Sequence, residues 1–217
     1  MKLRFAKGLD LPTDVVTQKI AFLGRTGSCK SFAADVLVES MLDIRAQVVI
    51  LDPVGIHYGL RLDASGKRPS NYQIPVLGGL HGDIPLEPTA GALIADLIVD
   101  RGISTVLDVS QMTSAEQARF ARAFATRLFE RKKASPSAIH LFIEECQEFV
   151  PQNVRGGGDE PAMLHAFERL VKLGRNFGIG ASLISQRPQE VNKKALNQTE
   201  FLLAFQMTGP QEKKSIK

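Results

Sequence analysis

The chain has 217 residues, of which 44% are hydrophobic and 23% are charged, and its formal net charge is +4. This length suits one large domain with a substantial core, and the mild positive charge permits a polyanionic partner without requiring one. Two cysteines, Cys29 and Cys146, are too few for a disulfide framework, and no long apolar run predicts a signal peptide or a membrane span. We therefore expect a cytoplasmic protein with no membrane partner.

Residues 1–19 carry no pattern to which a role can be assigned, but from residue 20 onward apolar strand segments alternate with helical patterns. The expected strands are 20–23, 47–51, 73–77, 105–109, 138–143, 180–184 and 200–206, and the expected helices are 31–44, 89–101, 115–133 and 162–177. Thr113 and Glu116 form an S/T-x-x-E capping box that predicts the start of the helix at 115–133. The strand segments are apolar without alternation, which is typical of strands buried on both faces of a parallel sheet. This order predicts a three-layer α/β domain with a largely parallel central sheet over residues 20–208, and a polar tail, ragged or truncated, over residues 209–217.

The first strand segment runs into a glycine-containing loop, GRTGSCKS, and a helical pattern follows at once. The phosphate-binding loop of nucleotide hydrolases reads G-x-x-x-x-G-K-[S/T] between a strand and a helix, and this stretch departs from it only at Cys29, where the second glycine belongs. In such a loop the backbone amides and the helix N-terminus face the phosphates, Lys30 supplies a cation and Ser31 offers a hydroxyl to Mg²⁺. The plain alternative is a Gly/Ser turn before an exposed lysine. The residues expected to bind the nucleotide are Gly24, Arg25, Thr26, Gly27, Ser28, Cys29, Lys30 and Ser31.

A pair of acids, Glu144 and Glu145, directly follows the apolar segment 138–143. Hydrolysis of a nucleoside triphosphate needs a metal ion near the β- and γ-phosphates and an oriented water molecule. We assign Glu144, with Ser31, to the metal ion and Glu145 to the role of general base or water-positioning residue. Glu144 is a mild departure, since an aspartate is more usual there. The alternative is a pair of exposed acids at a strand end, and the phosphate loop upstream weighs against it.

Further polar residues follow other strand segments, among them Asp52 and Gln186. Because ligands sit at the C-terminal ends of parallel strands, we expect these residues to lie near the loop and the acids. Gln186 could sense the γ-phosphate, although Ser-Gln-Arg-Pro could also be a simple polar turn. Arg175 and Arg187 are the candidates for a charge that reaches a phosphate in a neighbouring subunit, but solvated surface arginines are far commoner. For Cys146 we expect a role as core filler.

Taken together, these segments resemble the HerA/FtsK superfamily of P-loop ATPases, on the HerA-like side. At least two strand segments separate the loop from the acid pair, as in the branch of P-loop ATPases that has an added central strand and contains the RecA-like motors. The resembling pieces are GRTGSCKS (24–31), VVILDPVGIHYGLR (48–61), LFIEECQEFVPQ (141–152), LVKLGRNFGIGASLISQRPQEV (170–191) and ALNQTEFLLAFQMT (195–208).

The resemblance implies a RecA-like fold, ATP with Mg²⁺ as ligands, assembly into a ring that is typically hexameric, and DNA translocation or helicase action. It leaves room for a nuclease or another accessory partner. By position it implies that Glu144 and Glu145 are the Walker B pair, that Gln186 is the sensor and that Arg175 acts in trans. The sequence departs from the family pattern at Cys29, Gln147 and Gln206, and it lacks the N-terminal β-barrel of full HerA proteins. A stand-alone or truncated motor core fits these departures.

Three functions remain open at this stage. The first is an ATP-driven DNA motor that works as a ring, the second is a nucleotide-dependent switch that hydrolyses slowly or not at all, and the third is an assembly subunit of a secretion or conjugation machine. Cys29 favours the second: if its position demands positive φ, a Cβ there costs on the order of 1 kcal/mol or more, and it also crowds the phosphate.

Overall fold

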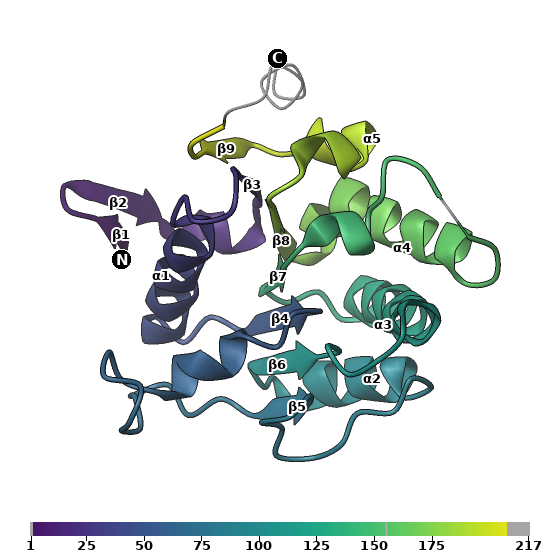
Figure 1. Ribbon diagram of the computed structural model, residues 1–217, viewed down its shortest axis with the longest axis horizontal. Helices are drawn as coiled ribbons and strands as arrows, with labels where there is room; N and C mark the ends of the chain where they lie inside the picture. The colour runs from purple at the N-terminus through teal and green to yellow at the C-terminus, as the bar shows by residue number, and fades with distance from the viewer. Residues whose placement is uncertain (1, 155, 208–217) are drawn as a thin grey trace.

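The computed structural model describes residues 2–154 and 156–207, and a seven-stranded sheet forms its middle layer (Figure 1). The strands of this sheet are β3 (Lys19–Leu23), β4 (Val48–Asp52), β5 (Val76–Gly78), β6 (Thr105–Asp108), β7 (Ile139–Ile143), β8 (Ile179–Ser185) and β9 (Phe201–Ala204). The α-helices are α1 (Lys30–Asp43), α2 (Gly91–Arg101), α3 (Ser114–Ala134), α4 (Glu160–Leu173) and α5 (Lys193–Leu196). The strand order is β5-β6-β4-β7-β8-β3-β9, and every neighbouring pair is parallel. The predicted α/β class with a parallel sheet is confirmed.

Helices cover both faces of the sheet and create two separate hydrophobic cores. Leu141 and Ile143 of β7 pack in the core that contains α2, α3 and α4, whereas Phe142 between them packs in the core that contains α1. Successive side chains of a strand point to opposite faces, so a strand covered on both sides is apolar at every position. This burial explains why the strand segments of the sequence show no alternation.

Helix α3 begins as the sequence predicts. The side chain of Thr113 accepts a hydrogen bond from the backbone of Glu116, and the Glu116 carboxylate accepts one from the backbone of Thr113. This capping box satisfies two N–H groups that the first helical turn would leave without a partner. The local pattern was sufficient here because both partners lie within four residues.

Two predicted elements differ from the structure by three or more residues at one end. The helix expected over 162–177 ends at Leu173 and continues as a 3₁₀ turn over Gly174–Phe177. The turn leads into Gly178, which has a φ of 83° and lies so close to the start of β7 that a Cβ would be 2.4 Å from the Ser137 carbonyl oxygen. The strand expected over 73–77 begins only at Val76, because Pro75 has no N–H to donate to a neighbouring strand.

The N-terminal residues, for which the sequence gives no role, form an antiparallel hairpin of β1 (Lys2–Ala6) and β2 (Leu9–Pro12). Leu3 is buried in the core that contains α1, and the Ser40 hydroxyl of α1 donates to the carbonyl oxygen of Arg4. The predicted tail at 209–217 lies outside the described residues. Within 2–154 and 156–207, the helices are all too short or too polar to cross a membrane.

Candidate functional site

The sheet topology brings the phosphate loop and the acid pair together. Strand β3 leads into the loop and strand β7 leads into Glu144 and Glu145, and only β8 separates these two strands. All three strands are parallel, so their C-terminal ends share one edge of the sheet. A cavity of about 270 Å³ opens at this edge. The residues that line it are Arg25, Thr26, Gly27, Ser28, Cys29, Lys30, Ser31, Phe32, Val54, Ile56, Glu144, Glu145 and Gln186.

The loop conformation depends on three residues with little or no side-chain bulk. A Cβ on Gly24 would lie 2.6 Å from the Cβ of Phe205, and Gly27 has a φ of 76°. Cys29 has a φ of 63° and a ψ of 21°, which is the left-handed region, and its side chain makes no capping hydrogen bond to α1. The position where the motif has glycine thus requires positive φ, and Cys29 adopts it despite its Cβ.

Helix α1 starts at Lys30, so its first N–H groups point toward the cavity that the loop surrounds. Ser31 is the next residue, and its hydroxyl donates a hydrogen bond to Oε1 of Glu144 over 3.1 Å. Glu144 is only 2% exposed. The serine assigned to the metal ion and the acid assigned to the metal ion are thus direct neighbours.

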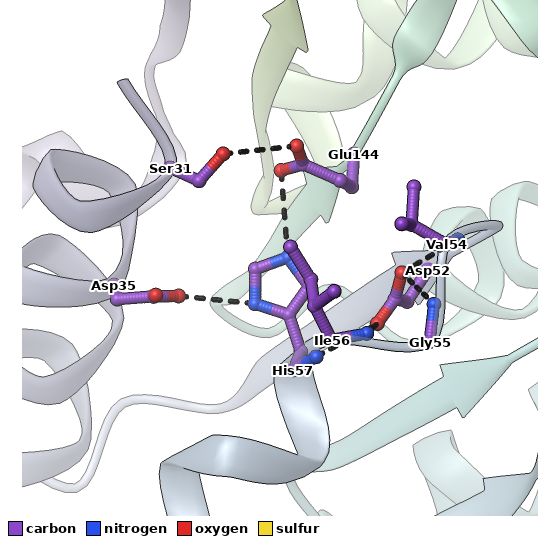
Figure 2. Close-up of polar contacts among 8 residues, drawn as sticks. All are labelled: Ser31, Asp35, Asp52, Val54, Gly55, Ile56, His57 and Glu144. Atoms are coloured by element: carbon purple, nitrogen blue, oxygen red, sulfur yellow. Dashed lines mark hydrogen bonds and ion pairs between the residues drawn. The ribbon is translucent and has the colours of Figure 1, made fainter. Parts of the chain in front are cut away.

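A histidine occupies the other side of the Glu144 carboxylate (Figure 2). The His57 ring lies 3.4 Å from Glu144 Oε2 through Nε2 and 3.0 Å from Asp35 Oδ1 through Nδ1. Burial opposes protonation of this ring, but the hydrogen bonds to Asp35 and Glu144 outweigh it and raise the pKa of His57 to about 10. Both ring nitrogens of His57 thus face carboxylate oxygens.

The backbone that carries His57 is fixed by Asp52, the last residue of β4. Its carboxylate is fully buried and accepts four backbone hydrogen bonds, from Val54, Gly55, Ile56 and His57, over 2.8–2.9 Å (Figure 2). Four such bonds turn the chain sharply after the strand and satisfy the charge without a cation. Asp52 lies at the expected edge of the sheet, but its carboxylate stabilises the backbone of residues 54–57 that follows β4.

Glu145 is held by a second chain of hydrogen bonds. Gln147 donates from Nε2 to Oε2 of Glu145 over 2.7 Å, and the hydroxyl of Ser185 donates to Oε1 of Gln147 over 2.6 Å. Glu145 itself has a φ of 43°, a left-handed conformation that is uncommon for a residue with a Cβ. Gln186 follows Ser185 at the end of β8 and accepts a hydrogen bond from the Thr26 hydroxyl of the phosphate loop.

The two arginines proposed to act on a neighbouring subunit do not line this cavity. Arg175 forms an ion pair with Glu200 just before β9, and Arg187 lies 3.5 Å from Glu190. Cys146 is buried in the core that contains α2, α3 and α4, as predicted for a residue that fills the core. Burial raises the pKa of its thiol well above the usual value.

Sequence reasoning missed the roles of His57 and Asp35. Ser31 and Asp35 lie four residues apart on α1, and this spacing places them on one face of a helix. It could have indicated that Asp35 faces the same edge of the sheet as Ser31. No local pattern marks His57, because its two partners come from α1 and from the end of β7, 22 and 87 residues away.

The oxygen donors at Ser31 and Glu144 suit Mg²⁺, which usually binds one or two protein oxygens and completes its shell with phosphates and water. Among residues 2–154 and 156–207, His, Cys, Asp and Glu side chains do not gather in threes to hold a metal ion. A Mg²⁺ ion in this site would therefore need further ligands from outside the protein, and a nucleotide held by the adjacent loop would supply phosphate oxygens.

Comparisons with known proteins agree with this architecture. In the DNA double-strand break repair helicase HerA of Pyrococcus furiosus, an 87-residue stretch is 28% identical and covers 40% of this chain and 15% of that protein. In the probable DNA double-strand break repair helicase HerA of Methanocaldococcus jannaschii, 142 residues are 25% identical and cover 64% of this chain and 27% of that protein. The matched region thus spans less than a third of either relative.

Two solved structures share the fold at low sequence identity. The VirB4 protein of Thermoanaerobacter pseudethanolicus superposes with a TM-score of 0.61 at 13% identity, over 95% of this chain and 83% of that one. The genome packaging NTPase B204 of Sulfolobus turreted icosahedral virus 2, in complex with ATP-gammaS, superposes with a TM-score of 0.58 at 15% identity, over 93% and 81%.

The model of one protein family, described as "Helicase HerA, central domain", matches residues 6–121. The matched region contains the second strand of the hairpin, the loop between β3 and α1, α1 itself and the loop after β4 with His57. Since it covers more than half of the 217 residues, the chain belongs to the family of the HerA helicase central domain.

Proposed function

We propose that the chain binds ATP with Mg²⁺ and hydrolyses it, as the motor core of a ring that moves DNA. The observation that carries this proposal is the single cavity lined by the phosphate loop, the acid pair and Gln186. The loop can hold phosphates, and Ser31 and Glu144 lie within hydrogen-bond distance of each other beside it. The names of the relatives, a helicase and a packaging NTPase, support an ATP-driven motor.

In this proposal the phosphate loop binds the triphosphate through its backbone amides, and Lys30 neutralises part of its charge. Ser31 and Glu144 hold the Mg²⁺ ion, which would neutralise negative charge on the phosphates. The positive end of α1 adds to this attraction, because the first turn carries no acidic residue. Binding thus uses residues from β3, α1 and β7.

Glu145 accepts the proton of the attacking water in this scheme. Its carboxylate is held by Gln147, which is held in turn by Ser185, so the base has one preferred orientation. Geometry of this kind contributes to catalysis because the base need not reorganise during the reaction. Gln186, which contacts Thr26, is placed to report the state of the loop to β8.

The ring and the DNA belong to the proposal as well. Arg175 lies outside its own subunit's cavity and pairs with Glu200, so it can act on a nucleotide only in a second copy. A head-to-tail contact between identical chains closes into a ring when the rotation between copies permits. The net charge of +4 is compatible with a DNA partner.

The test combines an ATPase assay with size measurement by light scattering, each with and without ATP and DNA on the same sample. We expect DNA to stimulate hydrolysis, and we expect a ring to form with ATP. The matched pair of controls is Lys30→Ala, which should lose ATP binding, and Lys67→Ala in an exposed loop, which should retain it. A monomer whose hydrolysis is indifferent to DNA would overturn the motor assignment.

Cys29 favours a second candidate function, a nucleotide-dependent switch that turns over slowly. The loop needs a left-handed backbone at this position, and the Cβ of Cys29 makes that conformation costly and crowds the space for a phosphate. An assembly subunit of a secretion or conjugation machine would behave similarly. In both cases ATP would change the assembly state while hydrolysis stayed slow with or without DNA, and the same measurements would show this.

A further inference from the structure

His57 lies among carboxylates that come from three different elements. Its ring faces Asp35 of α1 and Glu144 at the end of β7, and its backbone N–H donates to Asp52 of β4. The histidine is 2% exposed, and Asp52 and Glu144 are equally shielded from water. Asp35 is the outer partner, with 35% of its side chain exposed. Figure 2 shows the ring between the Asp35 and Glu144 side chains.

The ring has little freedom to leave this position. The four hydrogen bonds to Asp52 fix the backbone of residues 54–57, and each ring nitrogen faces a different carboxylate. A rotation of the ring would break both side-chain contacts within a buried site, where an unpartnered charge is costly. The histidine is therefore a rigid link between α1 and the metal-side acid.

We propose that His57 is a positioning residue that holds one oxygen of Glu144, so that the other oxygen faces Ser31 and the cation. Asp35 anchors the link to α1, one helical turn beyond Ser31. The inference rests on the proposed function, because it concerns how the same site binds Mg²⁺ beside a nucleotide. It assigns a role to a residue that touches neither the phosphate loop nor the proposed base.

The geometry explains why the orientation of Glu144 needs a second partner. Ser31 contacts Oε1 over 3.1 Å, and a cation held by Ser31 would compete with this hydrogen bond. The contact between His57 and Oε2 does not involve Ser31, so it can persist when the cation binds. Groups that orient a metal-binding side chain in this way typically change metal affinity or activity by 10- to 100-fold when they are removed.

The experiment measures Mn²⁺ binding to the full chain by electron paramagnetic resonance, with a non-hydrolysable ATP analogue present. His57→Ala should weaken Mn²⁺ binding in this complex about 10-fold, and Asp35→Ala should weaken it less, by roughly 3-fold, because Glu144 keeps its own contact with the ring. His57→Gln retains one N–H donor and should recover part of the loss. Binding of the analogue in EDTA should stay within roughly 2-fold of wild type for all three variants.

The matched control is His140→Gln. His140 is also buried, and its ring contacts the Val16 carbonyl oxygen and the Ser182 hydroxyl rather than a carboxylate. This variant controls for the general cost of losing a buried histidine and should bind Mn²⁺ as wild type does. His57→Ala could fail to fold. Asp35→Ala changes the more exposed end of the link, so it can still contradict the inference.

Two results would overturn the inference. One is wild-type Mn²⁺ affinity in a folded His57→Ala or Asp35→Ala variant, and the other is an equal loss of affinity in His140→Gln. A wild-type chain that binds the analogue without taking up Mn²⁺ would contradict the assigned metal site, and one that binds no analogue at all would contradict the proposed function. The EDTA and Mn²⁺ measurements therefore separate the failure of His57's role from the failure of the site.

Discussion

The two sides of the candidate site are stabilised in different ways. On the β3 side, the phosphate loop is largely exposed, and its last residue before α1 is Cys29, with positive φ and no side-chain cap. On the side of β4 and β7, Asp52, His57 and Glu144 are buried and linked by hydrogen bonds. The acid side is thus held by hydrogen bonds within the chain, whereas the loop directs its backbone amides at the cavity.

This difference indicates how the two sides should respond to mutation. A buried polar network loses stability when one partner is removed, because the remaining groups are left without hydrogen bonds. An exposed loop loses little stability, and changes there should appear mainly in ligand binding. Variants on the two sides can therefore test whether the acid side is rigid and the loop side is adaptable.

The largest effect is expected at Glu145. Glu145→Gln removes the proposed base, and loss of a general base typically lowers turnover by 10²- to 10⁴-fold. ATP should still bind and remain trapped, since the phosphate loop is unchanged. The measurements are single-turnover hydrolysis and retention of labelled ATP.

The matched control for this prediction is Glu148→Gln, an exposed acid three residues further on. It should hydrolyse ATP like wild type. An equal loss in both variants would mean that the reaction depends on negative charge near the end of β7 and not on the specific base held by Gln147.

Asp52 should give the largest change in stability. Asp52→Ala leaves four N–H groups without their acceptor, three from part-buried hydrogen bonds and one from a buried one, at roughly 1 kcal/mol each, so we expect the free energy of unfolding to fall by about 4 kcal/mol. Urea denaturation measures this change. Asp63→Ala removes a similar carboxylate acceptor from an exposed turn and should have a far smaller effect. Comparable losses would show that the β4 side is not specially rigid.

The free energy of unfolding should also depend on pH, through the titration of His140 in β7. Burial lowers the pKa of this histidine to about 4, although the Val16 carbonyl oxygen favours its protonation. In the unfolded chain it titrates near pH 6.5, so between pH 6.5 and 4 the unfolded state binds a proton that the folded state excludes. The free energy of unfolding should therefore fall as the pH falls through this window, by about 3 kcal/mol in all.

Urea denaturation at several pH values checks this expectation against His140→Gln, which cannot titrate. The stability difference between wild type and variant should shrink as the pH falls from 7 to 4. A constant difference would mean that His140 binds its proton equally in the folded and unfolded states and does not contribute to the loss of stability at low pH.

The features that the sequence predicted correctly are those whose causes are local. The cap of α3 needs only Thr113 and Glu116. Short apolar runs predict the buried strands. The turn between β3 and α1 is equally local, since the strand segment, the glycines and the helical pattern are adjacent in the sequence. The α/β class and the parallel sheet then follow from the alternation of strands and helices.

The features that the sequence did not predict depend on contacts between distant segments. His57 acquires its role from Asp35 and Glu144, and the N-terminal hairpin acquires its place from Leu3 packing near α1. Asp52 was expected beside the ligand because it ends a strand, yet four amides of its own loop occupy its carboxylate. Position at a strand end thus predicts where a residue lies, but its partners decide what it does.

The smallest effect, and the one that tests the loop side most directly, is expected at Cys29. Cys29→Gly removes a Cβ from a residue with a φ of 63°, which should relieve on the order of 1 kcal/mol and raise ATP affinity or turnover up to about 5-fold. Cys29→Ala keeps the Cβ and removes only the thiol, so it should leave both quantities near wild type. Equal gains in the two variants would assign the effect to the sulfur, and no gain in either would remove the main support for a slow switch. A gain confined to glycine would show that backbone strain in the exposed loop, and not the buried acid side, limits how well this site holds a nucleotide.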